Sequence, residues 1–212
     1  MKQAFIFLAG EIKNYDFFCR YPDMQNNGNV VICADGGYFH AKKLKIIPQF
    51  LVGDMDSIDE KTEDFSGMEI ICCPCEKDYT DGQFAVELAI KSGCEKITLF
   101  GALGGRFDHQ IGNLLLLKTI QSGGATGEII DSNCKILLVN EFARFECGGY
   151  RYISFVPLSE NVNGITLTGL KYPLNKANIT QSDFCTMSNE FADKVATITV
   201  DEGYLAAVLT AD

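Results

Sequence analysis

The sequence places acidic side chains directly after short apolar runs at several points in its first half. The clearest case is residues 51–57, where an apolar run opens into Asp54 and Asp56. In an extended backbone, side chains two residues apart point to the same face, so these carboxylates would lie side by side. Like charges this close are unfavourable unless a cation lies between them, and a hard divalent cation binds both carboxylate and phosphate oxygens. The alternative is a polar turn in which Asp56 or Ser57 caps the next helix.

A second acidic position, Asp35, follows the apolar residues 29–34 and precedes Gly36 and Gly37. The glycines would let the chain turn and let a ligand approach the backbone, while Asp35 would point toward the edge of the sheet. The alternative is an ordinary strand-to-helix turn with an aspartate cap. This segment alone leaves both interpretations open.

Residues 77–83 combine a helix start with an excess of acidic side chains. Thr80 lies three residues before a glutamine, which is the spacing of a capping box, and an aspartate in the first turn suits the helix dipole. Capping accounts for Thr80 but not for the local charge. The candidates for contacts with a metal or a substrate are therefore Asp78 and Asp81.

Residues 101–109 join an apolar run to a helical pattern through three glycines. Exposed backbone N–H groups at a helix start can hold phosphate oxygens, and Arg106 would add charge-assisted hydrogen bonds. The segment matches neither the G-x-x-x-x-G-K-[ST] loop nor the register of G-x-G-x-x-G. Gly104, Gly105 and Arg106 are thus candidate phosphate contacts, and His109 borders them, where it could orient the loop or touch phosphate.

The other reactive side chains form no recognisable catalytic set. His40 lies in a helical pattern with no evident partner, so we expect it to be structural. The nine cysteines are an odd number in a chain without a secretory signal, which favours reduced thiols. Cys72 and Cys75 have a C-x-x-C spacing, but no second pair completes a zinc site, so we expect free thiols.

Strand and helix patterns alternate up to residue 131, which predicts a mostly parallel sheet with helices on both faces, a Rossmann-like three-layer α/β domain. In such sheets ligands bind beyond the carboxyl ends of the strands, where the acidic and glycine segments all fall. The expected strands are 4–9, 29–34, 50–53, 69–73, 96–100 and 128–131, and the expected helices are 13–20, 38–45, 59–65, 80–92 and 108–121.

After residue 132 the pattern changes to short β-branched and aromatic runs separated by glycine turns, which predicts an all-β domain. We therefore expect two domains, 1–131 and 132–212. Within the second, Ser188 and Asn189 form a polar segment that by itself indicates a surface turn. The expected strands are 134–140, 145–147, 152–157, 165–168 and 196–200.

The composition of the 212 residues narrows the possible partners. A formal net charge of −10 argues against nucleic acid, which needs a basic face, and is compatible with a small cationic substrate. No apolar run reaches membrane-spanning length, and the N-terminal run is too short for a signal peptide. We expect a cytoplasmic protein without a membrane partner.

Four segments together resemble the thiamin pyrophosphokinase (thiamin diphosphokinase) family in their order and spacing, and Ser188–Asn189 resembles the thiamin-site motif of its C-terminal domain. The combination is specific, although each segment alone is not. The four segments are Ala-Asp-Gly-Gly at 34–37, Gly-Asp-Met-Asp-Ser at 53–57, Lys-Asp-Tyr-Thr-Asp at 77–81 and Gly-Gly-Arg-Phe-Asp-His at 104–109.

The resemblance implies an ATP-binding α/β domain, a C-terminal β-sandwich that binds thiamin, and a homodimer with sites at the subunit cleft. It also implies Mg²⁺-dependent transfer of the pyrophosphoryl group of ATP to the hydroxyl of thiamin, which gives thiamin diphosphate and AMP. The alternative is another Mg²⁺-dependent phosphotransferase, or a nucleotide-binding module, on the same α/β scaffold.

The resemblance also assigns roles to residues. Asp54, Asp56 and Asp81 would hold Mg²⁺, while Asp35 and Lys77 would line the thiamin or transfer site. The loop of Gly104, Gly105 and Arg106, with Asp108 and His109, would serve the nucleotide phosphates. The implied thiamin contacts are Lys77, Asp78, Ser188 and Asn189.

Overall fold

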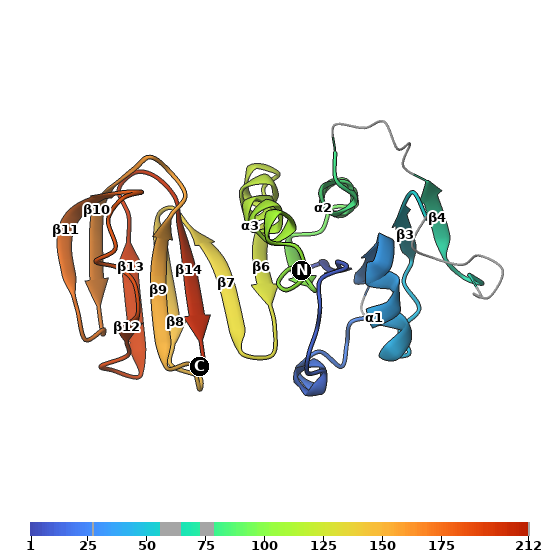
Figure 1. The fold of residues 1–212 in the computed structure, drawn as a ribbon, viewed down its shortest axis with the longest axis horizontal. Coiled ribbons are helices and arrows are strands. Elements are labelled where there is room, and N and C mark those ends of the chain that lie inside the picture. The colour runs from blue at the N-terminus through green and yellow to red at the C-terminus, as the bar shows by residue number, and fades with distance from the viewer. Residues whose placement is uncertain (27, 56–64, 73–78, 212) are drawn as a thin grey trace. The chain divides into compact units, whose positions relative to one another are not determined.

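A computed structural model gives the fold and describes every residue except 27, 56–64, 73–78 and 212. The chain divides into two compact units, Met1–Ser132 and Asn133–Asp212 (Figure 1). None of the described helices has the length and hydrophobicity needed to cross a membrane.

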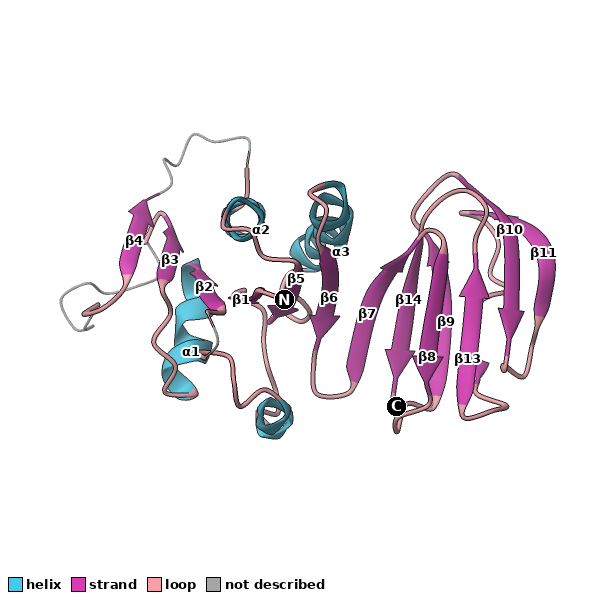
Figure 2. Ribbon diagram, turned by 180° about the vertical axis from the view of Figure 1, so that it is seen from behind, coloured by secondary structure: helices cyan, strands magenta, loops and turns pink. Residues whose placement is uncertain are grey.

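The described part of the first unit contains six parallel strands in the order β6-β5-β1-β2-β3-β4 (Figure 2). The chain builds outward from β1 to β4 and then returns to the other side of β1, so the strand order reverses between β1 and β5. This confirms the predicted parallel sheet. The strands are β1 Gln3–Phe7, β2 Val30–Ala34, β3 Phe50–Gly53, β4 Glu69–Cys72, β5 Lys96–Phe100 and β6 Thr126–Ile130.

Helices cover both faces of this sheet (Figure 2). Phe5 and Phe7 of β1 share one buried cluster with Phe18 of η1 and with Tyr38 and Ala41 of α1, so η1 and α1 pack on that face. The longer helices α2 and α3 pack against each other on the other face, where α2 contacts β1 to β3 and α3 contacts β6. The helical elements are η1 Asp16–Arg20, η2 Asp35–Gly37, α1 Tyr38–Lys43, α2 Asp81–Lys91 and α3 Phe107–Ser122.

The segment expected to be a helix over residues 13–20 is instead the short 3-10 helix η1. Its adjacent rings Phe17 and Phe18 stack with centroids 4.2 Å apart and are both buried in the cluster with Phe100. Two consecutive side chains can enter one core more easily from a tight, short turn than from a regular α-helix with a single buried stripe. The helix expected over residues 59–65 lies outside the described residues, apart from Phe65.

The second unit is a sandwich of two antiparallel sheets, ordered β12-β9-β14-β7 and β11-β10-β13-β8 in the described residues. Phe155 of β9 and Phe145 of β8 meet across the sheets in a T-shaped contact, with ring centroids 6.0 Å apart. The predicted all-β fold is confirmed. Its strands are β7 Cys134–Val139, β8 Phe142–Glu146, β9 Tyr152–Pro157, β10 Asn161–Thr168, β11 Leu174–Thr180, β12 Asn189–Glu190, β13 Val195–Thr199 and β14 Leu205–Thr210.

Three of these strands were not expected from the sequence. β14 pairs on both sides and is mostly buried, but its Leu-Ala-Ala-Val-Leu-Thr run lacks alternation and contains the helix former alanine. β11 is an edge strand with mostly exposed polar residues, and Lys176 has a positive φ of 49° within it. β12 is only two residues long. Each strand gives a weak sequence signal because tertiary pairing, not local pattern, forms it.

Candidate active site

A cleft of about 940 Å³ opens in the first unit beyond the carboxyl ends of its strands. Its walls include Leu8 to Gly10 after β1, the residues that directly follow β2 and β3, the start of α2, and the loop between β5 and α3. The cleft therefore lies where the strand order reverses between β1 and β5, the usual ligand position in open α/β sheets. Its volume is within the range of small-molecule sites.

Two of the predicted carboxylates are brought together by the pairing of β2 with β3. Ala34 is the register partner of Val52, so Asp35 and Asp54 leave neighbouring strand ends and both line the cleft. Gly53 has a φ of 150°, and a Cβ placed there would lie 3.2 Å from the Cβ of Asp35. A glycine at this position therefore lets the two acidic segments approach closely.

Asp81, the first residue of α2, supplies a third carboxylate to the cleft. Thr80 caps this helix, because its side-chain oxygen accepts the N–H of Gln83 at 3.2 Å. At Gly82 a Cβ would lie 3.1 Å from a methyl carbon of Leu8, so the helix start packs closely on the end of β1. The cap and this contact fix Asp81 at the rim, and the helix dipole favours its negative charge.

The loop between β5 and α3 lines the same cleft as these acids. Gly101, Gly104 and Gly105 all have positive φ, and the amide of Asn113 on α3 donates to the carbonyl of Ala102 at 2.9 Å. Arg106 is the N-cap residue of α3, but its side chain makes no capping bond. The first N–H groups of this sixteen-residue helix have no acceptor within the helix ladder, an arrangement that suits an anion.

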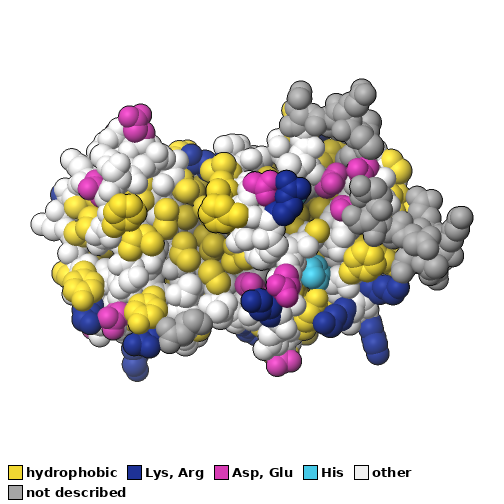
Figure 3. Space-filling model, viewed as in Figure 1, with side chains coloured by type: hydrophobic (Ala, Val, Ile, Leu, Met, Phe, Trp, Pro, Cys, Tyr) yellow, Lys and Arg dark blue, Asp and Glu magenta, His cyan; other side chains and the backbone are white. Residues whose placement is uncertain are grey.

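Arg106 and Asp108 form a two-point ion pair at this helix start. The Nε atom of Arg106 donates to one carboxylate oxygen at 3.2 Å, and a terminal guanidinium nitrogen donates to the other at 2.6 Å. The hydrogen bonds from Arg106 lower the pKa of Asp108, and those to Asp108 raise the pKa of Arg106. On the first unit, Figure 3 shows acidic side chains gathered next to a basic one. Both residues line the cleft, so the guanidinium is oriented before any ligand arrives.

The structure thus brings most of the predicted first-unit residues into one cleft. Asp56, Lys77 and Asp78 lie outside the described residues, so their predicted roles stay predictions. The predicted residues that line the cleft are Asp35, Asp54, Asp81, Gly104, Gly105, Arg106, Asp108 and His109.

Ser188 and Asn189 lie in the second unit. The Asn189 side chain is 1% exposed, and its oxygen accepts the N–H groups of Tyr172 and Glu190, each at 3.0 Å. Its amide nitrogen donates to the carbonyl of Tyr172 at 2.8 Å. Ser188 is exposed with a φ of 53°, and its N–H donates to the hydroxyl of Ser154 at 2.9 Å. The buried Asn189 side chain therefore fixes the backbone of Tyr172, and Ser188, its neighbour in the sequence, is exposed.

The donor chemistry of the cleft fits a hard divalent cation. Asp54 and Asp81, which with Asp35 form the acidic part of the cleft lining (the acidic wall), contribute carboxylate oxygens, which Mg²⁺ and Ca²⁺ prefer. Within the described residues no three His, Cys, Asp or Glu side chains come close enough together to hold a metal. The third predicted ligand, Asp56, lies outside those residues.

Sequence reasoning missed part of the lining, notably Leu8 to Gly10, Asn113 and Thr119. Gly10 directly follows the apolar run of residues 4–9, as Asp35 and Asp54 follow their own predicted strands. Position at a strand end was therefore a usable signal. Asn113 and Thr119 lie inside an apolar helical pattern, where nothing in the sequence distinguishes a cleft-facing polar residue from a surface one.

The fold and the cleft define a class: a two-unit protein whose α/β part has a cleft suited to a phosphate-bearing ligand and whose second part is a β-sandwich. Residues 21–126 match the family "Thiamin pyrophosphokinase, catalytic domain", and residues 141–205 match "Thiamin pyrophosphokinase, vitamin B1 binding domain". The chain belongs to the thiamin pyrophosphokinase family and is an enzyme with that activity. Membership implies ATP as co-substrate.

Individual relatives agree with this assignment. Thiamine pyrophosphokinase of Bacillus subtilis (strain 168) is 34% identical over 181 residues, which cover 79% of this chain and 80% of the relative. The crystal structure of the Bacillus subtilis enzyme superposes with a TM-score of 0.89 at 30% identity, covering 100% of both chains. The Geobacillus thermodenitrificans structure gives 0.84 at 27% identity, covering 100% of this chain and 98% of the other. The resemblance predicted from the sequence is confirmed.

Proposed function

We propose that the first-unit cleft binds ATP and that the enzyme transfers its terminal pyrophosphoryl group to the hydroxyl of thiamin, releasing AMP. The observation that carries this proposal is that Asp35, Asp54 and Asp81 line one cleft with the glycine loop and Arg106. Such a transfer needs alignment and charge neutralisation more than a covalent intermediate. The acidic wall and the anion-binding groups of the loop, which line the same cleft, supply both.

We assign the phosphates of ATP to the loop of Gly104 and Gly105, with Arg106 as their charged contact. Backbone N–H groups would donate hydrogen bonds to the phosphate oxygens without reorganisation, and the guanidinium would stabilise charge on the leaving AMP. Asp54, Asp56 and Asp81 would hold Mg²⁺, which when bound neutralises phosphate charge.

On the acceptor side, a carboxylate of this wall would take the proton of the thiamin hydroxyl, and Asp35 and Lys77 with Asp78 would line that part of the site. The fixed positive charge of thiamin favours such an acidic surface. Ser188 would contact thiamin, and Asn189 would hold the backbone of Tyr172 in place, as its hydrogen bonds support. We also propose a cytoplasmic homodimer with sites at the subunit cleft.

The first test is product analysis of the purified protein with ATP, Mg²⁺ and thiamin, omitting each in turn. We expect AMP and thiamin diphosphate in equal amounts. We expect Asp81→Asn to lower kcat at least about a hundredfold, because it removes one charge from the acidic wall without changing its shape. Release of ADP in place of AMP would instead identify a different phosphotransferase.

Asp16→Asn is the matched control, because Asp16 is an exposed acid of the same unit that does not line the cleft. It makes the same change in net charge and should keep wild-type kcat. Equal losses in both variants would show that total charge, not the acidic wall, governs the rate, and would contradict the assigned role of Asp81.

A further inference from the structure

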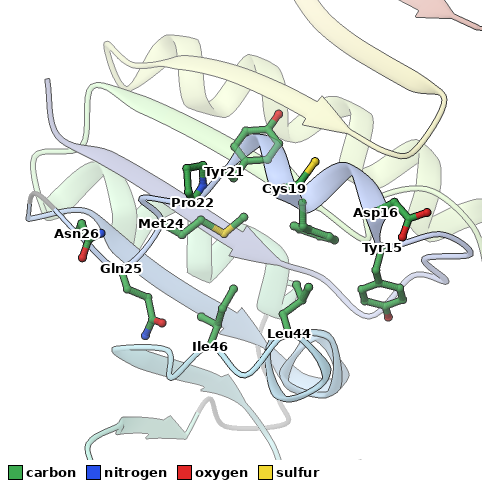
Figure 4. Close-up of a pocket in the computed structure, with 11 residues that line it drawn as sticks. Tyr15, Asp16, Cys19, Tyr21, Pro22, Met24, Gln25, Asn26, Leu44 and Ile46 are labelled. Carbon is green, nitrogen blue, oxygen red and sulfur yellow. The ribbon is translucent and has the colours of Figure 1, made fainter.

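His40 of α1 connects two segments that are far apart in the sequence. Its Nδ1 atom lies 2.6 Å from the hydroxyl of Tyr15, and its Nε2 atom lies 2.8 Å from the carbonyl oxygen of Gly10. Tyr15 is partly buried and lines one end of a second cavity, of about 660 Å³, on the first unit (Figure 4). That cavity shares no lining residue with the cleft, whereas Gly10 lines the cleft itself.

The partners of His40 determine which of its ring nitrogens carries the proton. A carbonyl oxygen can only accept, so Nε2 must donate to Gly10. Nδ1 of a neutral ring must then accept, and the hydroxyl of Tyr15 donates to it. Burial lowers the pKa of His40, the hydrogen bond to the Gly10 carbonyl raises it by a smaller amount, and nearby Lys43 lowers it. The net lowering makes the neutral ring the form at neutral pH. Both ring nitrogens therefore have a hydrogen-bond partner.

Gly10 in turn supports the glycine loop. Its N–H donates to the carbonyl of Gly101 at 2.8 Å, and a Cβ at Gly10 would run into the carbonyl oxygens of Gly101 and Leu103. The next residue, Glu11, lies against Gly104, where a Cβ would be 3.0 Å from the Glu11 carbonyl oxygen. The backbone of Gly10 and Glu11 is therefore in direct contact with both ends of the loop proposed to hold phosphate.

We propose that Tyr15 and His40 form a brace that positions Gly10, and through Gly10 the loop of Gly101 to Arg106, for pyrophosphoryl transfer. This rests on the proposed function, because it assumes that the loop binds the phosphates of ATP. His40 and Tyr15 are positioning residues, since neither lines the cleft. Small displacements of such a loop misalign the phosphate while leaving the thiamin surface of the second unit unchanged.

The test compares Tyr15→Phe, His40→Leu and His40→Gln in the full-length enzyme, using steady-state kinetics with ATP, Mg²⁺ and thiamin. Because misplacement of a reacting group by about 1 Å can cost about a hundredfold, we expect kcat to fall about tenfold in His40→Leu and about threefold or more in Tyr15→Phe. The KM for thiamin should stay within about twofold, since the thiamin surface is untouched. Glutamine carries one donor and one acceptor, so His40→Gln should recover most of kcat.

Tyr21→Phe is the matched control, because Tyr21 lines the same second cavity but packs on Phe5 and Phe100 rather than on His40. It should keep wild-type kcat. A purely structural role would lower the melting temperature of Tyr15→Phe and His40→Leu while leaving kcat unchanged, and this result would overturn the proposal. If His40→Leu does not fold, the kcat of Tyr15→Phe tests the proposal, because this variant removes only a single oxygen atom.

Nuclear magnetic resonance gives a readout that is independent of activity. Nitrogen-15 shifts of His40 should show a protonated Nε2 and an unprotonated Nδ1, and the opposite tautomer would overturn the brace. Amide resonances of Gly104 and Gly105 should move in Tyr15→Phe but not in Tyr21→Phe. An inactive wild-type enzyme would refute the proposed function, whereas an active one that is indifferent to these variants would refute only the brace.

Discussion

Arg106 and Asp108 show how one ion pair can prepare a site. Because hydrogen bonds from Arg106 lower the pKa of Asp108, this carboxyl stays ionised at pH values below its ordinary pKa and is protonated only when the pH falls through the lowered value. The pair is therefore intact at neutral and alkaline pH and is lost only in acid. Both side chains are well exposed, so we attribute orientation of the guanidinium, not fold stability, to the pair.

We expect Arg106→Lys to raise the KM for ATP about tenfold. An ammonium group cannot form two parallel hydrogen bonds to a phosphate as a guanidinium can. Each hydrogen bond to a charged group contributes about 1.5–3 kcal/mol. Steady-state kinetics with varied ATP measure this. Arg144→Lys is the control, because Arg144 also pairs with an acid two residues away, Glu146, on an exposed strand of the second unit. An unchanged KM in Arg106→Lys would remove the residue from the phosphate contacts.

At the residue scale, strand-end position made most of the cleft predictable. Asp35, Asp54 and Arg106 each follow an apolar run, and parallel strands must bring such positions to one edge. The partners of His40 were not predictable, because Tyr15 and Gly10 are separated from it by 25 and 30 residues. A hydrogen bond between loops of this separation leaves no periodic pattern in a sequence.

Helix α2 positions a site residue through its first turn. Its start must place Asp81 at the rim, and a capped first turn does this. The expected capping box is only half formed: Thr80 accepts the N–H of Gln83, but the side-chain amide of Gln83 donates to Glu87 at 3.4 Å. The hydrogen bond that the Thr80 side chain accepts from Gln83 is therefore the local interaction that fixes the start of the helix.

Replacing Thr80 by alanine should lower the free energy of unfolding by about 1 kcal/mol, the usual cost of losing an N-cap oxygen. Chemical denaturation of both proteins measures the difference. Thr80→Ser keeps the oxygen and should stay close to wild type. A loss as large in Thr80→Ser as in Thr80→Ala would mean that the methyl group, not the cap, contributes the stability.

Element boundaries were predictable where hydrophobic pattern and turn residues agreed, as at β3 and β5, which match their expected ranges. They were not predictable where pairing alone makes the strand, as in β14. The 3-10 helix η1 differs from its expected helix because two adjacent aromatic rings must enter the same core.

At the scale of the whole molecule, the two units have separate cores. One is built on the aromatic residues of β1 and its neighbours, and the other on Phe155 and the aliphatic residues of the facing sheets. Separate cores mean that a ligand can stabilise one unit without directly changing the packing of the other.

We expect ATP with Mg²⁺, in the absence of thiamin, to slow amide hydrogen exchange at Leu8 to Gly10, at Gly104 and Gly105 and at the start of α2. The core strands β9 and β13 should exchange at their unliganded rates, because bound ligand protects mainly the contacts that it touches. Hydrogen exchange with mass spectrometry measures both. Protection concentrated in β9 and β13 instead would place the nucleotide on the second unit and contradict the assignment of the cleft.

The close approach of Gly53 to Asp35 has a consequence for engineering. The spacing of Asp35 and Asp54 depends on how closely Gly53 approaches the Cβ, Cα and backbone nitrogen of Asp35. Core residues beneath the rim can therefore be exchanged for others of similar volume without moving the acids apart. A methyl group added at position 53, as in Gly53→Ala, would press against Asp35 and move the two acidic segments apart.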